Sequence, residues 1–183
     1  MQAQYAQQLC TLIETPRLLL QPLVSAHADM AFTALQDDAI YEWISMGKPT
    51  DVGGLRDHWK GLESRTSRDG TEAWPTWAVI SRDQGRMLGR VDAAINEDHV
   101  CTNFGYYFFS DFWGQGFASE AVKAAADHLL RQDIHRIVAT VTVGNHASAQ
   151  VLQKAGFAFT RVIPDNDTIR GELFDDEEYV RAV

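Results

Sequence analysis

Two glycines separate an aromatic segment from an alanine-rich one in the stretch Phe112 to Glu120, which reads Phe-Trp-Gly-Gln-Gly-Phe-Ala-Ser-Glu. The first N–H groups of a helix have no partners within the helix, and the helix dipole adds partial positive charge, so a phosphate binds there without a lysine. Gly114 and Gly116 have no Cβ, which permits positive φ and a close approach of backbone to a diphosphate. The stretch is therefore a candidate phosphate cradle, and a tight turn that binds nothing is the alternative.

The segments on either side of this joint have different periodicities. Residues 102–110 hold five aromatic side chains, a density typical of a buried strand. After the joint, apolar residues recur at steps of three and four, which predicts an amphipathic helix to about Arg131; they are Ala118, Ala121, Val122, Ala125, Leu129 and Leu130. The joint is thus predicted to turn a strand into a helix.

Composition narrows the class of protein. The chain has 183 residues, 45% hydrophobic and 22% charged, with a net charge of -9, as expected for one globular domain. An acidic chain without a basic stripe argues against nucleic acid as a partner; the charge suits an amine-bearing partner or serves solubility alone. No apolar run approaches the ~20 residues that cross a bilayer, so no membrane partner is expected. Met1 to Cys10 lacks the features of a secretory signal, which favours the cytoplasm.

Cysteine and histidine spacings give no sign of a metal site. Cys10 and Cys101 are the only cysteines, and they are interpreted as reduced thiols, although one disulfide stays open. No His-Glu-x-x-His pattern is present, so no metal is predicted.

The chain in order predicts a strand, two helices, three strands, a helix, a strand, a helix and two strands, which is a mixed α/β sheet. Ser25 is predicted to cap the first helix, and residues 1–13 are predicted to be a loose extension before a single domain over 14–183. The last two strands are predicted to meet at a turn over 164–167. The expected elements are 14–23, 26–35, 55–65, 77–80, 87–95, 102–110, 118–131, 136–143, 146–155, 157–163 and 168–179.

Four sequence pieces occur in an order and spacing that resemble the GNAT acetyltransferases, most closely the Rim-type branch that acetylates ribosomal-protein N-termini. They are Thr-Pro-Arg-Leu-Leu-Leu (15–20), Phe-Gly-Tyr-Tyr-Phe (104–108), Trp-Gly-Gln-Gly-Phe-Ala-Ser-Glu-Ala (113–121) and Asn-His-Ala-Ser-Ala-Gln-Val-Leu-Gln-Lys-Ala-Gly-Phe (145–157). The resemblance implies a largely antiparallel sheet, splayed open beside the aromatic strand, with helices on both faces. It also implies acetyl-CoA in the splay, with its pyrophosphate on the helix that starts near Gly116.

The resemblance implies the residues that contact CoA. The family motif Gln/Arg-x-x-Gly-x-Gly/Ala falls on residues 113–118, where Trp113 replaces Gln/Arg and leaves a backbone contact only. Backbone groups near 108–110 are expected to pair with the pantetheine as a further strand would. Asn145 is expected to bind the pantetheine, to cap its helix, or both. The expected CoA contacts are Phe108, Phe109, Ser110, Trp113, Gly114, Gln115, Gly116, Phe117, Ala118, Ser119, Asn145 and Ser148.

Direct acyl transfer needs a neutral amine, a polarised thioester carbonyl and a proton for the departing thiolate. A backbone N–H near Phe108 is expected to meet the carbonyl. Many relatives carry a tyrosine acid at the position that reads Leu152 here, so Ser148, one turn after Asn145, is the candidate partner of the thiolate. The alternative for Ser148 is a small residue that allows close helix packing.

The general base is left open by the sequence. Relatives often carry a glutamate where this chain has Asn103, which cannot take a proton but can position a water. Asp92, His99 and His146 are alternatives, and Glu120 is interpreted as an acceptor for backbone donors.

Two functions follow from the resemblance. The favoured one is an acetyl-CoA-dependent N-acetyltransferase whose acceptor is a primary amine, either a protein N-terminus or a small molecule such as an aminoglycoside, polyamine or amino acid. The other is a catalytically weak acyl-CoA-binding or regulatory protein. Acceptor specificity is expected in the region 41–77, whose four tryptophans line a pocket or form core; they are Trp43, Trp59, Trp74 and Trp77. A homodimer is left open.

Overall fold

The strands form one eight-stranded sheet in the computed structural model, which describes residues 3–183. The strand order is β1-β2-β3-β4-β5-β6-β8-β7, and every neighbouring pair is antiparallel except β5 and β6. The strands are β1 (Ile13–Glu14), β2 (Leu18–Pro22), β3 (Thr76–Ser81), β4 (Met87–Ile95), β5 (Val100–Phe108), β6 (Arg136–Thr142), β7 (Ala158–Ile169) and β8 (Glu172–Ala182). The predicted mixed, largely antiparallel sheet is confirmed.

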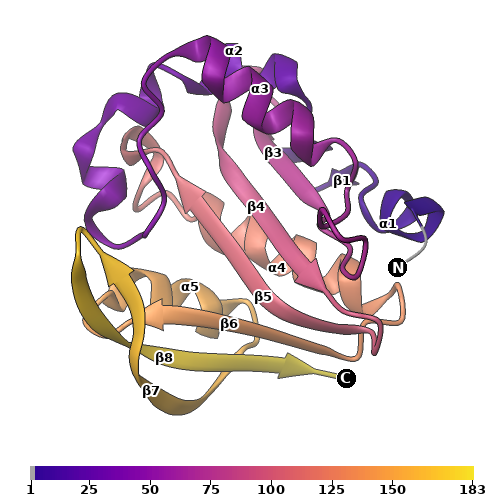
Figure 1. Cartoon of the computed structure of the whole chain (residues 1–183), viewed down its shortest axis with the longest axis vertical. Coiled ribbons are helices and arrows are strands. Elements are labelled where there is room, and N and C mark those ends of the chain that lie inside the picture. The colour runs from indigo at the N-terminus through magenta and orange to yellow at the C-terminus, as the bar shows by residue number, and fades with distance from the viewer. Residues whose placement is uncertain (1–2) are drawn as a thin grey trace.

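Helices cover both faces of this sheet (Figure 1). The α-helices are α1 (Ala3–Leu9), α2 (Ala28–Ala31), α3 (Val52–Leu62), α4 (Phe117–Leu130) and α5 (His146–Lys154). Side chains alternate between the faces of β5: Phe104 and Phe108 belong to the core beneath α4, whereas Tyr107 and Phe109 belong to the core beneath α3. None of the helices within 3–183 combines the length and the hydropathy that crossing a bilayer requires.

The two parallel strands at the centre of the sheet diverge soon after they meet. β5 pairs with β6 only at Val100 with Arg136 and at Cys101 with Ile137. Beyond that point β5 stays paired with β4, and β6 stays paired with β8 to its end at Thr142. The backbone edge of β5 from about residue 102 onward therefore faces no strand, and Figure 1 shows the two ribbons separating. This is the splay that the family resemblance implied.

The prediction of a loose extension over 1–13 is wrong for the described part of it; residues 1–2 lie outside the described residues. Ala3–Leu9 is a helix, and Ala6, Leu9 and Cys10 are buried in the core beneath α4. The Leu9 carbonyl lies 2.8 Å from Nε2 of the buried His128 on α4. Apolar residues at 6, 9, 10 and 13 have the three- and four-residue spacing of an amphipathic helix, a signal that the sequence analysis did not use.

We expect Leu9→Ala to lower the free energy of unfolding by about 2–5 kcal/mol, because a fully buried leucine leaves a cavity when it is truncated. Leu12→Ala is the matched control, because Leu12 is 50% exposed and its loss should change stability by less than about 0.5 kcal/mol. Urea unfolding of the two variants measures both values. Equal stability of the two variants would mean that α1 does not belong to the folded core.

The region after β2 is more broken than the predicted helix over 26–35. Ser25–His27 and Ala34–Gln36 are 3-10 turns on either side of α2, and Ser25 caps nothing with its side chain. Its backbone N–H instead donates to Oε1 of Glu63 at 2.8 Å. The next helix, α3, starts three residues before the predicted 55–65, because Asp51 caps it by accepting from the Gly54 N–H at 2.8 Å.

The hairpin between the last two strands turns later than predicted. β7 continues through 164–167 with an irregular register between Ile163 and Asp167. The chain reverses at Arg170 and Gly171, whose φ angles are 55° and 87°. Two consecutive residues at positive φ match the twist of a two-residue hairpin turn, so this pair, and not the proline segment, sets the turn.

Candidate active site

The open edge of β5 carries backbone groups that are free to meet a ligand. The Phe109 N–H donates to the Leu88 carbonyl at 2.9 Å, and Tyr107 lies opposite Arg90. Because N–H and C=O groups alternate along an antiparallel pair, those of Tyr106 and Phe108 point away from β4 and into the splay. The Phe108 carbonyl there accepts a hydrogen bond from Nε1 of Trp113 at 2.7 Å. The Phe108 N–H is therefore the group of this residue that can polarise a carbonyl.

The joint between β5 and α4 has the geometry that its glycines predicted. Gly114 and Gly116 have φ angles of 71° and 79°, and Gly116 immediately precedes α4. A Cβ at Gly114 would meet no atom within 4 Å, and one at Gly116 would lie 3.5 Å from Nη2 of Arg17. No side chain in the described part of the chain caps α4 at its Gly116 end. The first N–H groups of α4 thus have no capping side chain, which leaves them available to an anion.

Arg17 lies beside this helix start and was not a predicted site residue. Its Nε contacts Oε2 of Glu120 at 2.6 Å, its Nη1 donates to the Gln115 carbonyl at 3.0 Å, and its guanidinium carbon lies 4.4 Å from the centroid of the Phe117 ring. Oε1 of Glu120 accepts from the Arg17 backbone N–H at 3.0 Å, so the backbone donor that this carboxylate serves lies before β2 and not at the start of its own helix. In the sequence, Arg17 was noted only as part of the Thr-Pro-Arg segment that carries the family resemblance.

A pair of hydroxyl groups joins β5 to α5 across the splay. The Ser148 Oγ lies 2.7 Å from the Tyr106 hydroxyl, which is also 3.1 Å from the Ser148 carbonyl. Asn145 caps α5 by accepting from the Ser148 N–H at 3.1 Å, as predicted. Burial raises the pKa of Tyr106, so its hydroxyl keeps its proton near neutrality. Tyr106 was missed as a site residue because in sequence it is one of five aromatics in a strand.

The two other candidate catalytic residues lie on the opposite face of β5 from this pair. Asn103 and Asp92 line a cavity of about 390 Å³ together with Glu72 and Trp74. Asp92 lies opposite Gly105, and Asn103 shares the strand face of Gly105, whereas Tyr106 projects to the other face. The structure therefore does not bring them to Ser148.

The two histidine alternatives have different surroundings. His99 lies in the turn between β4 and β5, where its Nδ1 is 3.2 Å from the Tyr5 hydroxyl of α1, so it serves the fold. His146 is an exposed residue at the start of α5, next to Asn145.

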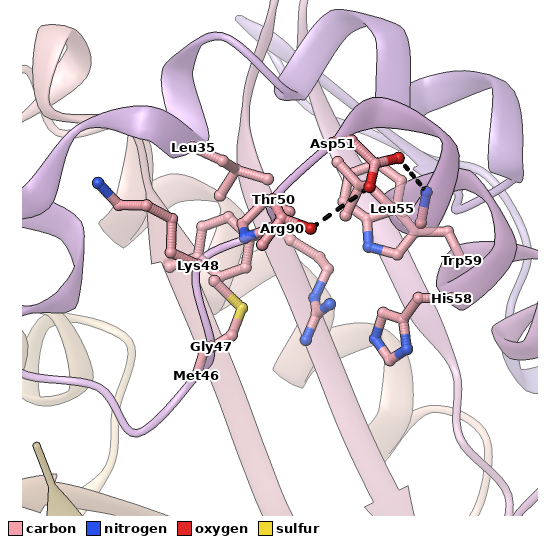
Figure 2. A pocket seen from close by; sticks show the side chains of 13 residues that line it. Leu35, Met46, Gly47, Lys48, Thr50, Asp51, Leu55, His58, Trp59 and Arg90 are labelled. Atoms are coloured by element: carbon pink, nitrogen blue, oxygen red, sulfur yellow. Dashed lines mark hydrogen bonds between the residues drawn. The ribbon is translucent and has the colours of Figure 1, made fainter.

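A second cavity, of about 430 Å³, opens between α3 and the strands β4 and β5 (Figure 2). Of the four tryptophans, Trp59 of α3 lines this cavity and Trp74 lines the neighbouring one. Trp77 is fully buried in the core. The Trp43 ring packs against Gly144, 3.5 Å from the position that a Cβ would take there. The predicted region 41–77 thus supplies a wall of each cavity. Tyr107, which lies between Tyr106 and Phe108 on β5, lines the larger one.

The splayed sheet and the open start of α4 define an acyltransferase of the CoA-dependent kind. The family model of the acetyltransferase (GNAT) domain matches residues 17–158, and the chain belongs to this family. It is an acyltransferase whose co-substrate is acetyl-CoA.

Individual relatives agree with this assignment. The uncharacterized N-acetyltransferase p20 of Bacillus licheniformis is 25% identical over 168 residues, which cover 88% of this chain and 90% of p20. The solved structure of RimL, a ribosomal-protein acetyltransferase in complex with coenzyme A, has a TM-score of 0.81 at 21% identity and covers 94% of this chain and 98% of its own. A ribosomal-protein-S5-alanine acetyltransferase from Vibrio fischeri has a TM-score of 0.81 at 19% identity, with coverages of 94% and 96%. These structures confirm the fold.

Proposed function

We propose that this protein transfers the acetyl group of acetyl-CoA directly to a primary amine, in the manner of the Rim-type acetyltransferases. The observation that carries the proposal is the meeting of three features in one splay: the open edge of β5, the uncapped start of α4 and the hydroxyl pair of Tyr106 and Ser148. Each feature serves one part of a thioester co-substrate. The alternative of an acyl-CoA-binding protein without turnover uses only the first two.

The co-substrate is bound mainly by backbone in this proposal. The diphosphate lies on the N–H groups at the start of α4, from Gly114 to Ser119, and the Arg17 guanidinium, paired with Glu120, lies beside them. The pantetheine follows the end of β5 near Phe109 and Ser110, and the side-chain amide of Asn145 faces it. Both described cysteines are free and buried, which suits a reducing compartment such as the cytoplasm.

The chemistry is one displacement at the thioester carbonyl. The amine nitrogen forms the new bond to the carbonyl carbon, the carbon–sulfur bond breaks, and the electron pair leaves on sulfur. The Phe108 N–H stabilises the negative charge on the carbonyl oxygen, and the Ser148 hydroxyl donates to the departing thiolate. The proton lost by the amine passes to water, and no single side chain is an indispensable base.

Tyr106 has the role of orienting Ser148. When the Tyr106 O–H donates to the Ser148 Oγ, the serine proton is free to point at the sulfur, because a hydroxyl carries one proton and two lone pairs. We expect Tyr106→Phe to lower kcat about two- to thirteenfold, which corresponds to one net hydrogen bond of about 0.5–1.5 kcal/mol, with the KM for acetyl-CoA unchanged. Steady-state kinetics measure this change.

A double-mutant cycle separates positioning from packing. In the Ser148→Ala background, Tyr106→Phe should change kcat no further, because the group it orients is absent. If Tyr106→Phe lowers kcat equally in both backgrounds, Tyr106 acts independently of Ser148 and the proposed role is wrong.

Turnover with a panel of amines tests the function itself. The panel holds a peptide with a free N-terminus, a polyamine, an aminoglycoside and several amino acids, and free thiol and acetylated product are measured together. We expect thiol and acetylated amine to form in equal amounts for at least one class. Tight acetyl-CoA binding with no acetylated product from any class would favour the binding protein without turnover.

A further inference from the structure

The larger cavity is lined both by hydrogen-bond donors and by apolar side chains. Its apolar wall comes from Leu35, Met46, Leu55 and Trp59. Its polar wall comes from the loop before α3, from α3 itself and from the two strands beneath, and Figure 2 shows Arg90 of β4 and His58 of α3 on the side of the cavity away from Leu35. The polar members are Lys48, Thr50, Asp51, His58, Arg90 and Tyr107.

Arg90 is held in place with part of its guanidinium unused. Its Nε and Nη2 each lie 2.9 Å from Oδ1 of Asp92, two residues further along β4. A Cβ at Gly105 would lie 3.1 Å from Oδ2 of Asp92, so the glycine makes the room that this carboxylate occupies. No acceptor within residues 3–183 meets Nη1 of Arg90. Arg90 lines both cavities, whereas Asp92 lines only the neighbouring one, so the guanidinium reaches the larger cavity without its carboxylate partner.

Tyr107 adds a buried donor without a partner. It lies directly opposite Arg90 in the β4–β5 register, its ring centroid is 5.3 Å from the Arg90 guanidinium carbon, and it is 8% exposed. Its hydroxyl finds no hydrogen-bond partner in the described part of the chain. Burial raises the pKa of Tyr107, so the hydroxyl is a donor near neutrality. A buried hydroxyl without a partner is destabilising, and an oxygen of a bound ligand would satisfy it.

The cavity lining offers spare hydrogen-bond donors to a negative ligand and no unoccupied carboxylate to a positive one. Lys48 and Arg90 are the cations of the lining, and each is paired with a carboxylate outside it, Lys48 with Asp38 and Arg90 with Asp92. The one carboxylate in the lining, Asp51, already accepts from the Gly54 N–H and the Thr50 hydroxyl. Burial, and then the charge of Arg90, lower the pKa of His58, so its ring is neutral near pH 7. The net charge of -9 of the whole chain is therefore not reflected in the lining of this cavity. A polycation such as a polyamine fits the lining poorly.

We propose that this cavity is the acceptor pocket and that the acceptor is an amine with an apolar body and a carboxylate, as in a free apolar amino acid. The carboxylate binds the spare edge of Arg90 with the Tyr107 hydroxyl as second donor, and the apolar body packs between Leu55 and Trp59. Tyr107 shares its strand with Phe108, whose N–H faces the splay, so the amine lies next to the thioester. This inference rests on the proposed acetyl transfer.

Pairs of amines that differ only in the carboxylate test it. The probes are L-leucine, L-methionine and L-phenylalanine, each against its carboxamide, with acetyl-CoA as donor and thiol release as readout. The amine of a carboxamide loses its proton more readily, so intrinsic reactivity favours the amide and any preference for the acid reports recognition. We expect kcat/KM for the acids to exceed that for the amides about ten- to 150-fold, the range of one charge-assisted hydrogen bond.

Three variants assign the preference to this site. Arg90→Gln should remove it, and Tyr107→Phe, which keeps the ring and loses only an unpartnered hydroxyl, should reduce it while the protein stays folded. Arg68→Gln is the control, because Arg68 is exposed and lines neither cavity, and it should keep the full preference. If the enzyme acetylates the amides as well as the acids, or if the preference survives both Arg90→Gln and Tyr107→Phe, the proposal is overturned.

If no amine is acetylated, calorimetry still tests the pocket, because it measures binding of each acid and each amide to the CoA-bound protein. Binding of an acid that Arg90→Gln abolishes would support the pocket and place the failure on the proposed acetyl transfer. No binding of any of the three acids at millimolar concentration would overturn the pocket whether or not another amine is acetylated.

Discussion

Gly116→Val is expected to weaken acetyl-CoA binding at least about tenfold, or about 1.4 kcal/mol, in a protein that remains folded. Gly116 has a φ of 79° immediately before α4, where the diphosphate is proposed to lie. A Cβ there meets only the end of the Arg17 side chain, at 3.5 Å, so the protein itself has room for a side chain. A β-branched residue at this φ is strained by about 1–3 kcal/mol, and its methyl groups would occupy the space of the ligand.

Gly85→Val separates strain from lost contact. Gly85 has a φ of 64° in the turn before β4, and a Cβ there would meet no atom within 4 Å. This control carries a similar backbone strain away from the splay, so we expect similar destabilisation in urea and wild-type affinity for acetyl-CoA by calorimetry. Wild-type affinity in folded Gly116→Val would show that the diphosphate lies elsewhere.

Ser148→Ala is expected to lower kcat about five- to 150-fold and to leave the KM for acetyl-CoA nearly unchanged. A hydroxyl cannot release its proton outright near neutrality, so its effect is a hydrogen bond of about 1–3 kcal/mol to charge that develops on sulfur. An interaction made mainly in the transition state appears in kcat and not in KM. In the proposed arrangement Tyr106 donates across the 2.7 Å contact with Ser148 Oγ, which leaves the serine proton free to point at the sulfur.

Kinetics at saturating amine measure this value, with unfolding in urea as a check that α5 keeps its Asn145 cap. A wild-type kcat would reduce Ser148 to a packing residue. A loss of kcat beyond a thousandfold would mean that protonation of the thiolate depends on Ser148 alone. It would contradict the proposal that the Phe108 N–H and the positioning of the two substrates share the catalysis.

The sequence predicted those strand and helix bounds that are set by residues adjacent in the chain. β4 has the predicted bounds 87–95, β6 ends one residue before the predicted 143, and α4 and α5 begin where glycine and asparagine predicted. The errors lie where packing or a remote partner decides. The N–H of Ser25 is taken by Glu63, 38 residues away, and α1 is fixed by core contacts and by His128.

The site divides in the same way. The turn into α4 was predictable because a helix start and its glycines are adjacent in sequence. Tyr106 and Ser148 are 42 residues apart, and Arg17 and Glu120 are 103 apart, so only the folded sheet shows that they touch. The cavity proposed for the acceptor combines one helix, one loop and two strands, and neither the spare edge of Arg90 nor the unpartnered Tyr107 hydroxyl has a signature in sequence.

A crystal structure of the protein with CoA tests the central claim most directly, because every role proposed for the splay depends on where this molecule lies. The account predicts diphosphate oxygens within hydrogen-bond reach of the N–H groups at the start of α4, the pantetheine along the end of β5, and the thiol beside the Ser148 hydroxyl. A CoA molecule bound outside the splay, or one with its diphosphate away from α4, would contradict it.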